Sequence, residues 1–384
     1  MTGDPRTVLI VNPGSDLYGS DRVLLESVKA LVAAEHRVVV TVPGDGPLVA
    51  HLRDCGASVV QHQTPVLRKG LLSPRGLIRL GAETCSSLLP SRRLLRATNA
   101  ATVMVNTLTA PMWLLLARVS RRTVVCHVHE AESNTPALVR RLLYIPLIFS
   151  HRIVANSRFT LEVLARSARW LRRRTAVVHN AVPGPSEVVP AREDLAGSIR
   201  LLYFGRLSAR KGPHVVVDAL RILKGRGVDA RLTILGDVFP GNEDYEVSLR
   251  KKVRDADLED SVRWLGFQSE VWPFLADCDI ALVPSTGDES FGNAAVEASL
   301  AGRPVIVSDI AGLREASEGA HARLTVPAGD PEGVASAVAT IAEDWSRYRQ
   351  LAVVDSRNAA RTFSRENYAR GLLAAMGLTT PGAQ

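Results

Sequence analysis

Two segments in the second half of the chain combine charged side chains with glycines. The first, residues 205–212 (GRLSARKG), follows an apolar run and carries Arg206 and Lys211. The guanidinium of an arginine can donate two hydrogen bonds to phosphate oxygens at once, and the ammonium of a lysine adds a positive charge. Gly205 lets the backbone approach a ligand closely. The glycine and lysine order of a Walker loop is absent. This segment predicts a cationic cradle for phosphate, and a solvated basic loop is the alternative.

The second segment, residues 284–298, predicts a loop that turns into a helix. The backbone amides of Phe291, Gly292 and Asn293 would form a positive helix N-terminus that suits a phosphate. Glu297 would lie about 7 Å further along the helix, where a carboxylate can accept hydrogen bonds from ribose hydroxyls. Glu289, still in the loop, would reach beyond the phosphates to the group that they carry. A glycosidase pair is the competing interpretation of the two glutamates, but a glycosidase needs no phosphate cradle.

The elements that must position these residues follow an α/β pattern. Short β-branched runs alternate with helical patterns over all 384 residues, which predicts two doubly wound domains with parallel sheets. The expected strands are 8–11, 38–42, 59–60, 102–105, 123–128, 153–156 and 176–179 in the first half, and 201–204, 232–235, 262–265, 280–283, 305–307 and 324–326 in the second. Ligands bind outside the carboxyl ends of such strands, where Asn12, Asn106, His129, Asn156 and Asn180 fall.

Composition shifts suggest the domain boundaries. We expect a first Rossmann-like domain over 1–183, a proline-containing linker over 184–197, a second Rossmann-like domain over 198–356, and a C-terminal segment over 357–384. Charge is uneven, because residues 1–185 carry 24 Lys and Arg against 11 Asp and Glu, while 186–384 carry 23 against 28. A basic first domain favours anionic partners: nucleic acid, lipid headgroups or phosphorylated substrates.

Several segments together resemble the retaining glycosyltransferases of the GT-B fold, and within them family 4, the group 1 glycosyl transferases. The resemblance covers nearly the whole chain. It rests on the pair Glu289 and Glu297 at E-x7-E spacing, on Phe204–Leu207 with Arg210–Gly212, and on His127–Glu130, Val154–Ser157 and Val178–Pro183. It implies two Rossmann-like domains whose parallel sheets face a central cleft, and a nucleoside diphosphate sugar as donor. By the same resemblance, the domain over 1–183 would bind the acceptor, the domain over 198–356 would bind the nucleotide sugar, and a C-terminal helix within 357–384 would return to the first domain.

The resemblance also implies the roles of single residues. Arg206 and Lys211 would bind the diphosphate in place of a metal, Glu297 would hold the ribose, and Glu289 and His129 would contact the sugar. Fixed cations at the leaving phosphate would accelerate the reaction, because negative charge develops there. The acceptor would attack from the face of the leaving group, and a phosphate oxygen would take its proton. No metal, cofactor or protein nucleophile is then expected.

The loop after the first strand departs from the family pattern. Residues 18–21 read Tyr-Gly-Ser-Asp where a double glycine, a small residue and Glu are usual, and Ser290 stands where Pro is frequent. Gly19 of this loop is expected at the donor, while Tyr18, Ser20, Asp21 and Asn106 are expected at the acceptor.

Other features favour ordinary roles. The Asp-x-Asp pattern of some metal sites occurs twice, at Asp277-Cys278-Asp279 and at Asp255-Ala256-Asp257. We interpret the first as a turn and the second as part of a charged helix. The four cysteines form no C-x-x-C pair, which favours reduced thiols. The five tryptophans are scattered and offer no platform for stacking bases, so no nucleic-acid partner is expected. Neither an export signal nor a membrane span is apparent, and we expect a cytoplasmic protein.

One basic segment of the first half bears on the acceptor. Residues Leu161 to Arg174 place apolar residues at near-helical spacing beside Arg166, Arg169, Arg172 and Arg173. This pattern predicts a basic amphipathic helix on an anionic membrane surface. We therefore expect peripheral membrane association and a lipid-linked or anionic glycan acceptor of cell-envelope polysaccharide assembly. A soluble small-molecule acceptor is the alternative, and an epimerase or hydrolase of nucleotide sugars with the same fold is another.

Overall fold

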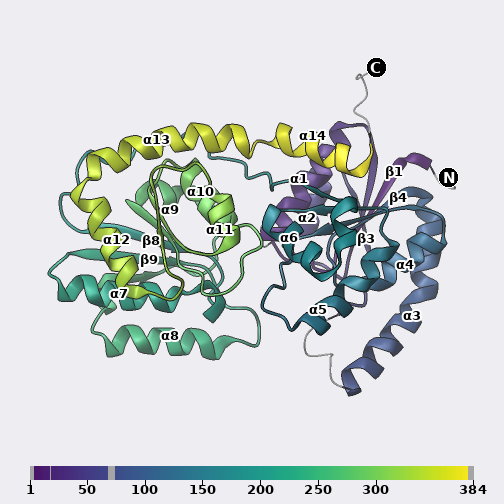
Figure 1. Ribbon diagram of the computed structural model, residues 1–384, viewed down its shortest axis with the longest axis horizontal. Coiled ribbons are helices and arrows are strands. Elements are labelled where there is room, and N and C mark those ends of the chain that lie inside the picture. Colours follow the sequence, from purple (N-terminus) through teal and green to yellow (C-terminus); the bar gives the residue numbers. More distant parts are fainter. Residues whose placement is uncertain (1–3, 18, 68–73, 379–384) are drawn as a thin grey trace. The chain divides into compact units, whose positions relative to one another are not determined.

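The computed structural model describes residues 4–17, 19–67 and 74–378. Contacts between residues divide the chain into two units, of which unit 1 comprises residues 1–181 with 365–384 and unit 2 comprises 182–364. Each unit is built on one parallel sheet (Figure 1). Every expected strand is present within a few residues of its predicted bounds.

Unit 1 contains, among its described residues, a seven-stranded sheet in the order β3-β2-β1-β4-β5-β6-β7. Its strands are β1 (Asp4–Val11), β2 (Arg37–Val42), β3 (Ser58–Gln61), β4 (Ala100–Val105), β5 (Thr123–Val128), β6 (Arg152–Ala155) and β7 (Thr175–Val177). Its helices are α1 (Gly19–Ala33), α2 (Pro47–Asp54), α3 (Pro74–Thr98), α4 (Pro111–Val119), α5 (Ala137–Tyr144), η2 (Ile145–Phe149), α6 (Arg158–Ser167), η3 (Arg169–Arg174) and α14 (Arg365–Met376), where η marks a 3₁₀ helix.

Both faces of this sheet are buried, which explains its continuous apolar runs. Val8 and Ile10 pack in a core that includes residues of α1, α2 and α14, whereas Leu9 and Val11 pack in a second core with α4, η2 and α6. The alternation follows from the two-residue period of a strand. The C-terminal helix α14 is fastened to α1 by a hydrogen bond of 2.6 Å between the hydroxyls of Ser27 and Tyr368.

Unit 2 contains a six-stranded sheet among its residues, all of which are described, in the order β10-β9-β8-β11-β12-β13. Its strands are β8 (Ile199–Phe204), β9 (Ala230–Leu235), β10 (Val262–Trp264), β11 (Ile280–Val283), β12 (Val305–Ser308) and β13 (Arg323–Val326). Its helices are η4 (Ala209–Lys211), α7 (Pro213–Gly225), α8 (Glu243–Asp255), η5 (Glu259–Ser261), α9 (Trp272–Asp277), α10 (Asn293–Leu300), α11 (Ala311–Ala316), α12 (Pro331–Glu343) and α13 (Trp345–Thr362).

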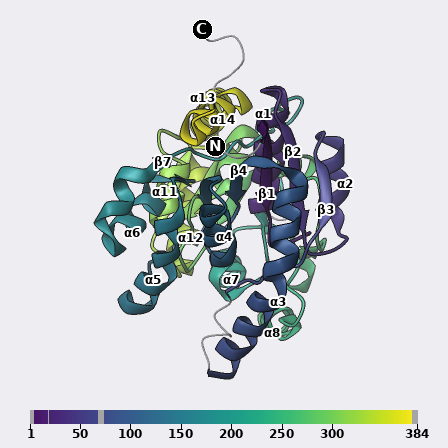
Figure 2. The ribbon, with the colours of Figure 1, turned by 90° about the vertical axis from the view of Figure 1, so that its right-hand side faces the viewer.

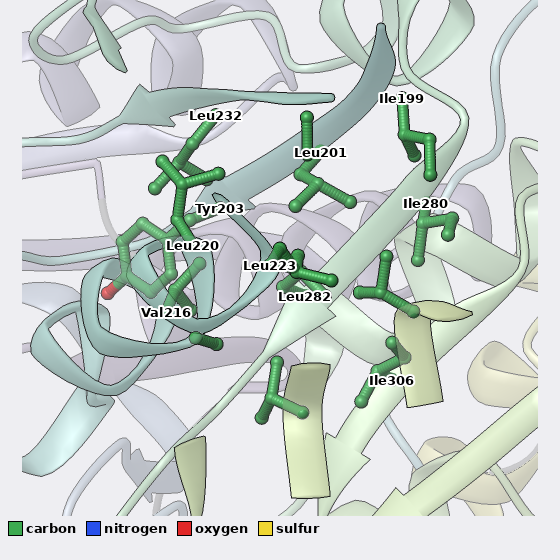
Figure 3. Packing of buried hydrophobic residues seen from close by; sticks show 14 of the residues in the cluster. Ile199, Leu201, Tyr203, Val216, Leu220, Leu223, Leu232, Ile280, Leu282 and Ile306 are labelled. Carbon is green, nitrogen blue, oxygen red and sulfur yellow. The ribbon is translucent and has the colours of Figure 1, made fainter. Parts of the chain in front are cut away.

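One core of unit 2 joins strand and helix side chains. Leu201 and Leu282 project from β8 and β11 towards Val216, Leu220 and Leu223 of α7 (Figure 3). Residues such as Leu202 and Val283 face the opposite core with α9, α10 and α11. The sheet is therefore doubly wound like that of unit 1, and in both units the strand order reverses at one point, between β1 and β4 and between β8 and β11. Polar loops at such a switch point are the expected ligand sites of the fold.

The predicted amphipathic helix over Leu161 to Arg174 is wrong. Helix α6 ends at Ser167, Ala168 is extended, and η3 follows. Leu164 and Leu171 are fully buried in the core of unit 1. Helical spacing of apolar residues indicates that a helix has an apolar face, but not whether that face is buried or exposed. Here the apolar face packs against the sheet of unit 1. The five arginines of this segment remain exposed.

Candidate active site

The loops that follow β8 and β11 lie together at the switch point of unit 2. The backbone amide and hydroxyl of Thr286 donate to the carbonyl oxygens of Arg210 (2.8 Å) and Ala209 (2.7 Å). Gly212 has a positive φ of 73°, and a Cβ there would lie 2.0 Å from the Pro284 carbonyl oxygen. Any other residue at this position would push the two loops apart, so glycine is required on both conformational and steric grounds.

Glu289 lies at the centre of these loops and is 7% exposed. Its carboxylate accepts hydrogen bonds from Lys211 Nζ at 2.7 Å, Arg210 Nη1 at 3.0 Å and Ser285 Oγ at 2.9 Å. Burial by itself raises the pKa of this carboxyl, but Lys211 and Arg210 more than offset burial, so its pKa lies below the ordinary value. Glu289 is therefore ionised at neutral pH and orients two cations.

Arg206 follows β8 and is held by the loop after β9. Its guanidinium carbon lies 3.8 Å from the centroid of the Phe239 ring, and its carbonyl oxygen accepts from the Tyr203 hydroxyl at 2.8 Å. Stacking on an aromatic face restricts a guanidinium while leaving its N–H edge available for hydrogen bonding. The loops are pressed together at Gly236, where a Cβ would lie 1.9 Å from the Gly205 carbonyl oxygen.

The segment predicted to hold phosphate and ribose begins helix α10. Asn293 is the first residue of this helix, Gly292 precedes it with a φ of 120°, and Glu297 lies in its second turn, partly buried. The Phe291 side chain is buried and packs edge-to-face on Phe363. The Phe291 side chain is therefore not accessible to a ligand. A Cβ on Gly312 of α11 would lie 1.9 Å from the Glu289 carbonyl oxygen, so α11 supports the glutamate loop from behind.

In unit 1, hydrogen bonds join the predicted residues at the strand ends. Nε2 of His129 lies 2.9 Å from Asn106 Oδ1, and the amide nitrogen of Asn106 donates to Asn12 Oδ1 at 2.9 Å. The amide nitrogen of Asn12 in turn donates to the carbonyl oxygen of Gly14 at 2.9 Å and approaches Asp21 Oδ1 at 3.5 Å. With the Asn106 amide in this orientation, His129 donates from Nε2 and its Nδ1 is the acceptor.

Gly19 and Ser20 begin α1 and are exposed. Tyr18 lies outside the described residues. His127 is buried beside His129, and their ring centroids are 4.0 Å apart. Burial lowers the pKa of His129 to about 4 and that of His127 well below its ordinary value. His129 is therefore neutral at physiological pH and offers hydrogen bonds rather than positive charge.

Acidification should destabilise the protein through His129. Its pKa is about 4 when folded and 6.5 when unfolded, so between these values the unfolded state binds more protons and stability falls as the pH falls. From pH 7 to pH 5 the loss of unfolding free energy expected from His129 alone is about 2 kcal/mol, and buried His127 adds to the loss in the same direction. Urea unfolding curves at both pH values measure it.

The variant His129→Asn should lose about 2 kcal/mol less than the parent between the same pH values. Replacing the exposed His51 of α2 by Asn is the matched control and should change nothing. An unaltered pH dependence in His129→Asn would contradict the assignment.

Two residues at the unit 2 loops were missed by sequence reasoning. Arg210 lies inside the recognised segment, but nothing in the sequence indicates that it shares Glu289 with Lys211. Phe239 has no sequence signal at all, because it lies 33 residues after Arg206 in another loop. The Asp-x-Asp residues have structural partners: buried Asp279 forms ion pairs with Arg192 (2.7 Å) and Arg200 (3.1 Å).

Comparison with known families agrees with this architecture. Residues 18–183 match the family described as Glycosyltransferase Family 4, and residues 190–353 match Glycosyl transferases group 1. These matches, one in each unit, together with two Rossmann-like sheets, define a GT-B protein. The chain belongs to the family 4 glycosyltransferases of the GT-B fold.

Two curated relatives illustrate the similarity. A D-inositol 3-phosphate glycosyltransferase of Pseudarthrobacter chlorophenolicus is 39% identical over 31% of this chain and 29% of its own length. A GDP-mannose-dependent phosphatidylinositol dimannoside mannosyltransferase of Mycobacterium tuberculosis is 32% identical over 54% of this chain and 48% of its own. The matched region thus spans less than half of each relative.

A solved structure matches over nearly the whole chain. The Anabaena protein HepE, in complex with UDP and glucose, superposes with a TM-score of 0.80 and 20% identity, covering 96% of this chain and 99% of its own. At this identity the similarity concerns the fold. In the part of the chain that the structure describes, every helix is too short or too polar to cross a bilayer.

Proposed function

We propose that this protein is a retaining, metal-independent glycosyltransferase that moves a sugar from a nucleoside diphosphate sugar to a lipid-linked or anionic glycan of cell-envelope polysaccharide assembly. The observation that carries the donor assignment is the buried, ionised Glu289 between Lys211 and Arg210, at the switch point of unit 2. A site with fixed cations and one oriented carboxylate suits a leaving diphosphate beside sugar hydroxyls.

Each residue has a role in this proposal. Arg206 and Lys211 bind the diphosphate and stabilise the charge that develops on it, and Arg210 adds a third cation at the same loop. Glu289 accepts hydrogen bonds from the sugar, and Glu297 accepts from the ribose. The acceptor hydroxyl attacks on the face of the leaving group, its proton passes to a phosphate oxygen, and the glycosidic bond to the diphosphate breaks. Neutral His129 supplies hydrogen bonds to the sugar.

The names of similar proteins support the class of substrate without selecting a base. The structure of HepE contains UDP, whereas the mycobacterial relative is named as GDP-mannose-dependent. Both curated relatives are named for phosphorylated inositol acceptors, which agrees with an anionic acceptor for the basic first half of this chain. We infer a cytoplasmic protein that associates peripherally with the inner face of the membrane.

Thermal unfolding with a panel of nucleotide sugars tests the donor assignment. A donor present at 100 times its Kd should stabilise the protein by about 2.7 kcal/mol, and slow hydrolysis of the same donor should be detectable. An absence of both effects with every UDP and GDP sugar would contradict the proposal. Rearrangement of the donor without any acceptor would instead indicate an epimerase.

Glu297→Ala should weaken binding of the nucleoside diphosphate alone by about tenfold, because hydrogen bonds to the ribose are lost. Isothermal titration calorimetry measures this affinity directly. Replacing Glu318, an exposed glutamate after α11, by Ala is the matched control. If Glu297→Ala binds the nucleotide like the parent, the ribose is held elsewhere.

A further inference from the structure

An apolar surface runs along α5 and continues into η2. The side chains on its outer side are 70%, 58%, 56% and 53% exposed and belong to Leu138, Leu142, Ile145 and Ile148, which we call the α5–η2 ridge. Tyr144 and Leu147, on the inner side of the same element, are buried. A surface helix of a soluble domain normally turns polar residues outward. Single exposed apolar residues are common, but four in succession on one side mark an interaction surface.

Neighbouring helix α4 extends this surface. It packs against η2 and carries two further exposed apolar side chains, Leu115 and Val119. In Figure 2, α4, α5 and α6 can be followed on the side of unit 1 that faces the viewer. All of these residues belong to unit 1.

The segment that carries the ridge is rich in positive charge. Residues 111–174, which include α4, α5, η2, α6 and η3, contain twelve arginines, three glutamates, and neither lysine nor aspartate. Arg141, between Leu138 and Leu142 in the sequence, is exposed. At the η2 end, Arg174 donates to the carbonyl oxygen of Ile148 at 3.2 Å and lies over the ring of partly exposed Trp170.

Apolar side chains, arginines and an exposed tryptophan on one surface match the chemistry of an anionic lipid interface. A second copy of the chain fits less well. A twofold interface places the same patch on both subunits, so the arginines of one copy would meet those of the other. Charge complementarity thus selects a negatively charged lipid surface as the occupant.

We propose that the α5–η2 ridge inserts into the headgroup region of an anionic membrane, with Arg141, Arg174 and their neighbours on the lipid phosphates. The proposal moves the apolar part of the docking element from residues 161–174 to the α5–η2 ridge, since two leucines of that segment are fully buried. Trp170 and Arg174 of the same segment remain at the η2 end of the ridge.

Docking through the α5–η2 ridge would bring a lipid-linked acceptor near the carboxyl ends of the unit 1 strands. This consequence rests on the proposed function. Arg140 of α5 donates to the carbonyl oxygen of Ser133 at 2.9 Å, in the loop between His129 and the ridge. Its Nε also donates to Ser167 Oγ of α6 at 2.9 Å. These hydrogen bonds fix α5 relative to the loop that follows β5.

Co-sedimentation with vesicles tests the docking surface. The full chain should bind vesicles of phosphatidylglycerol and phosphatidylcholine at low salt, bind pure phosphatidylcholine vesicles at least about tenfold more weakly, and dissociate as salt rises. Leu138→Ser with Leu142→Ser should lower binding to anionic vesicles by at least about tenfold. Val247→Ser with Val354→Ser, at exposed positions of unit 2, is the matched control and should bind like the parent.

Reversing the charge of one arginine separates the electrostatic contribution to vesicle binding from the apolar contribution. Arg141→Glu should weaken binding to anionic vesicles severalfold and flatten the salt dependence, whereas Arg221→Glu, at an exposed position of α7, should change neither. Circular dichroism melting of each variant verifies folding, and the salt titration of the parent tests the electrostatic part without any variant.

Three outcomes would overturn the proposal: equal binding of the parent to neutral and anionic vesicles, parental binding by the Leu138 and Leu142 double variant, or a parent dimer that the same double variant converts to a monomer without any vesicle binding. Donor binding measured without vesicles keeps the two proposals apart. If donor binding persists while vesicle binding is absent, only the docking surface is wrong. If vesicle binding persists while no donor binds, only the proposed function is wrong.

Discussion

Lys211→Ala and Arg206→Ala should each lower kcat/KM for the donor by about 30- to 1,000-fold, which corresponds to about 2 to 4 kcal/mol of transition-state stabilisation. The reason is that both side chains are cations held in place before the reaction. Glu289 orients Lys211, and Phe239 stacks on the guanidinium of Arg206. Steady-state kinetics with the donor found by thermal stabilisation measure the effect.

The same assay tests the absence of a metal requirement. Transfer by the parent should persist in excess EDTA, because the two cations supply the charge that a metal supplies elsewhere. Lys224→Ala, on α7 and hydrogen-bonded to a backbone carbonyl, is a control for the loss of one lysine from unit 2. Loss of activity on chelation that a divalent ion restores would refute the cationic mechanism.

Glu289→Ala should separate binding from turnover. We expect nucleoside diphosphate affinity within about threefold of the parent and a loss of at least about 100-fold in turnover of the complete donor. The carboxylate contributes no donor to the phosphates, and Lys211, which it orients, keeps its charge in the variant, so we expect removal of the carboxylate to cost little nucleotide affinity. Turnover should fall because the variant lacks the carboxylate that accepts hydrogen bonds from the sugar hydroxyls in the proposed mechanism.

Folding of unit 2 is a necessary control for this variant. Removing a buried carboxylate leaves Lys211 and Arg210 without their counter-charge, but both retain access to water, and we expect only about 1 kcal/mol of destabilisation. Glu289→Gln keeps the side-chain volume and an acceptor for Ser285, and it should be milder in both stability and turnover. Nucleotide affinity that falls as much in Glu289→Ala as in Glu297→Ala would contradict the division of roles.

The sequence by itself determined the strands, the class of fold and the chemical character of the loops. Parallel strands covered on both faces need continuous apolar runs, so Val8 to Val11 and Ile280 to Val283 could be recognised without a structure. The cations at 206 and 211 beside Gly205 can be read in order along the chain as a predicted phosphate loop. The steric need for glycine at 212 cannot, because it comes from the Pro284 carbonyl oxygen in another loop.

Contacts between distant loops depended on the tertiary structure. Glu289 meets Arg210 and Lys211 across nearly 80 residues because β8 and β11 are neighbours in the sheet, and Asn106 meets Asn12 across 94 residues because β1 and β4 are neighbours. Strand order decides these pairs, and no local pattern encodes it. The same holds for Phe239, which reaches Arg206 from the loop after β9.

The surface of unit 1 depended on the tertiary structure for another reason. Leu164 and Leu142 both lie on short helices beside arginines, yet the first is fully buried and the second is 58% exposed. Hydrophobic periodicity indicates that a helix has an apolar face. The exposure of that face depends on whether a sheet packs against it. Only the packing of α6 on its sheet, and the exposure of Leu142 of α5 among the described residues, distinguished core from candidate membrane surface.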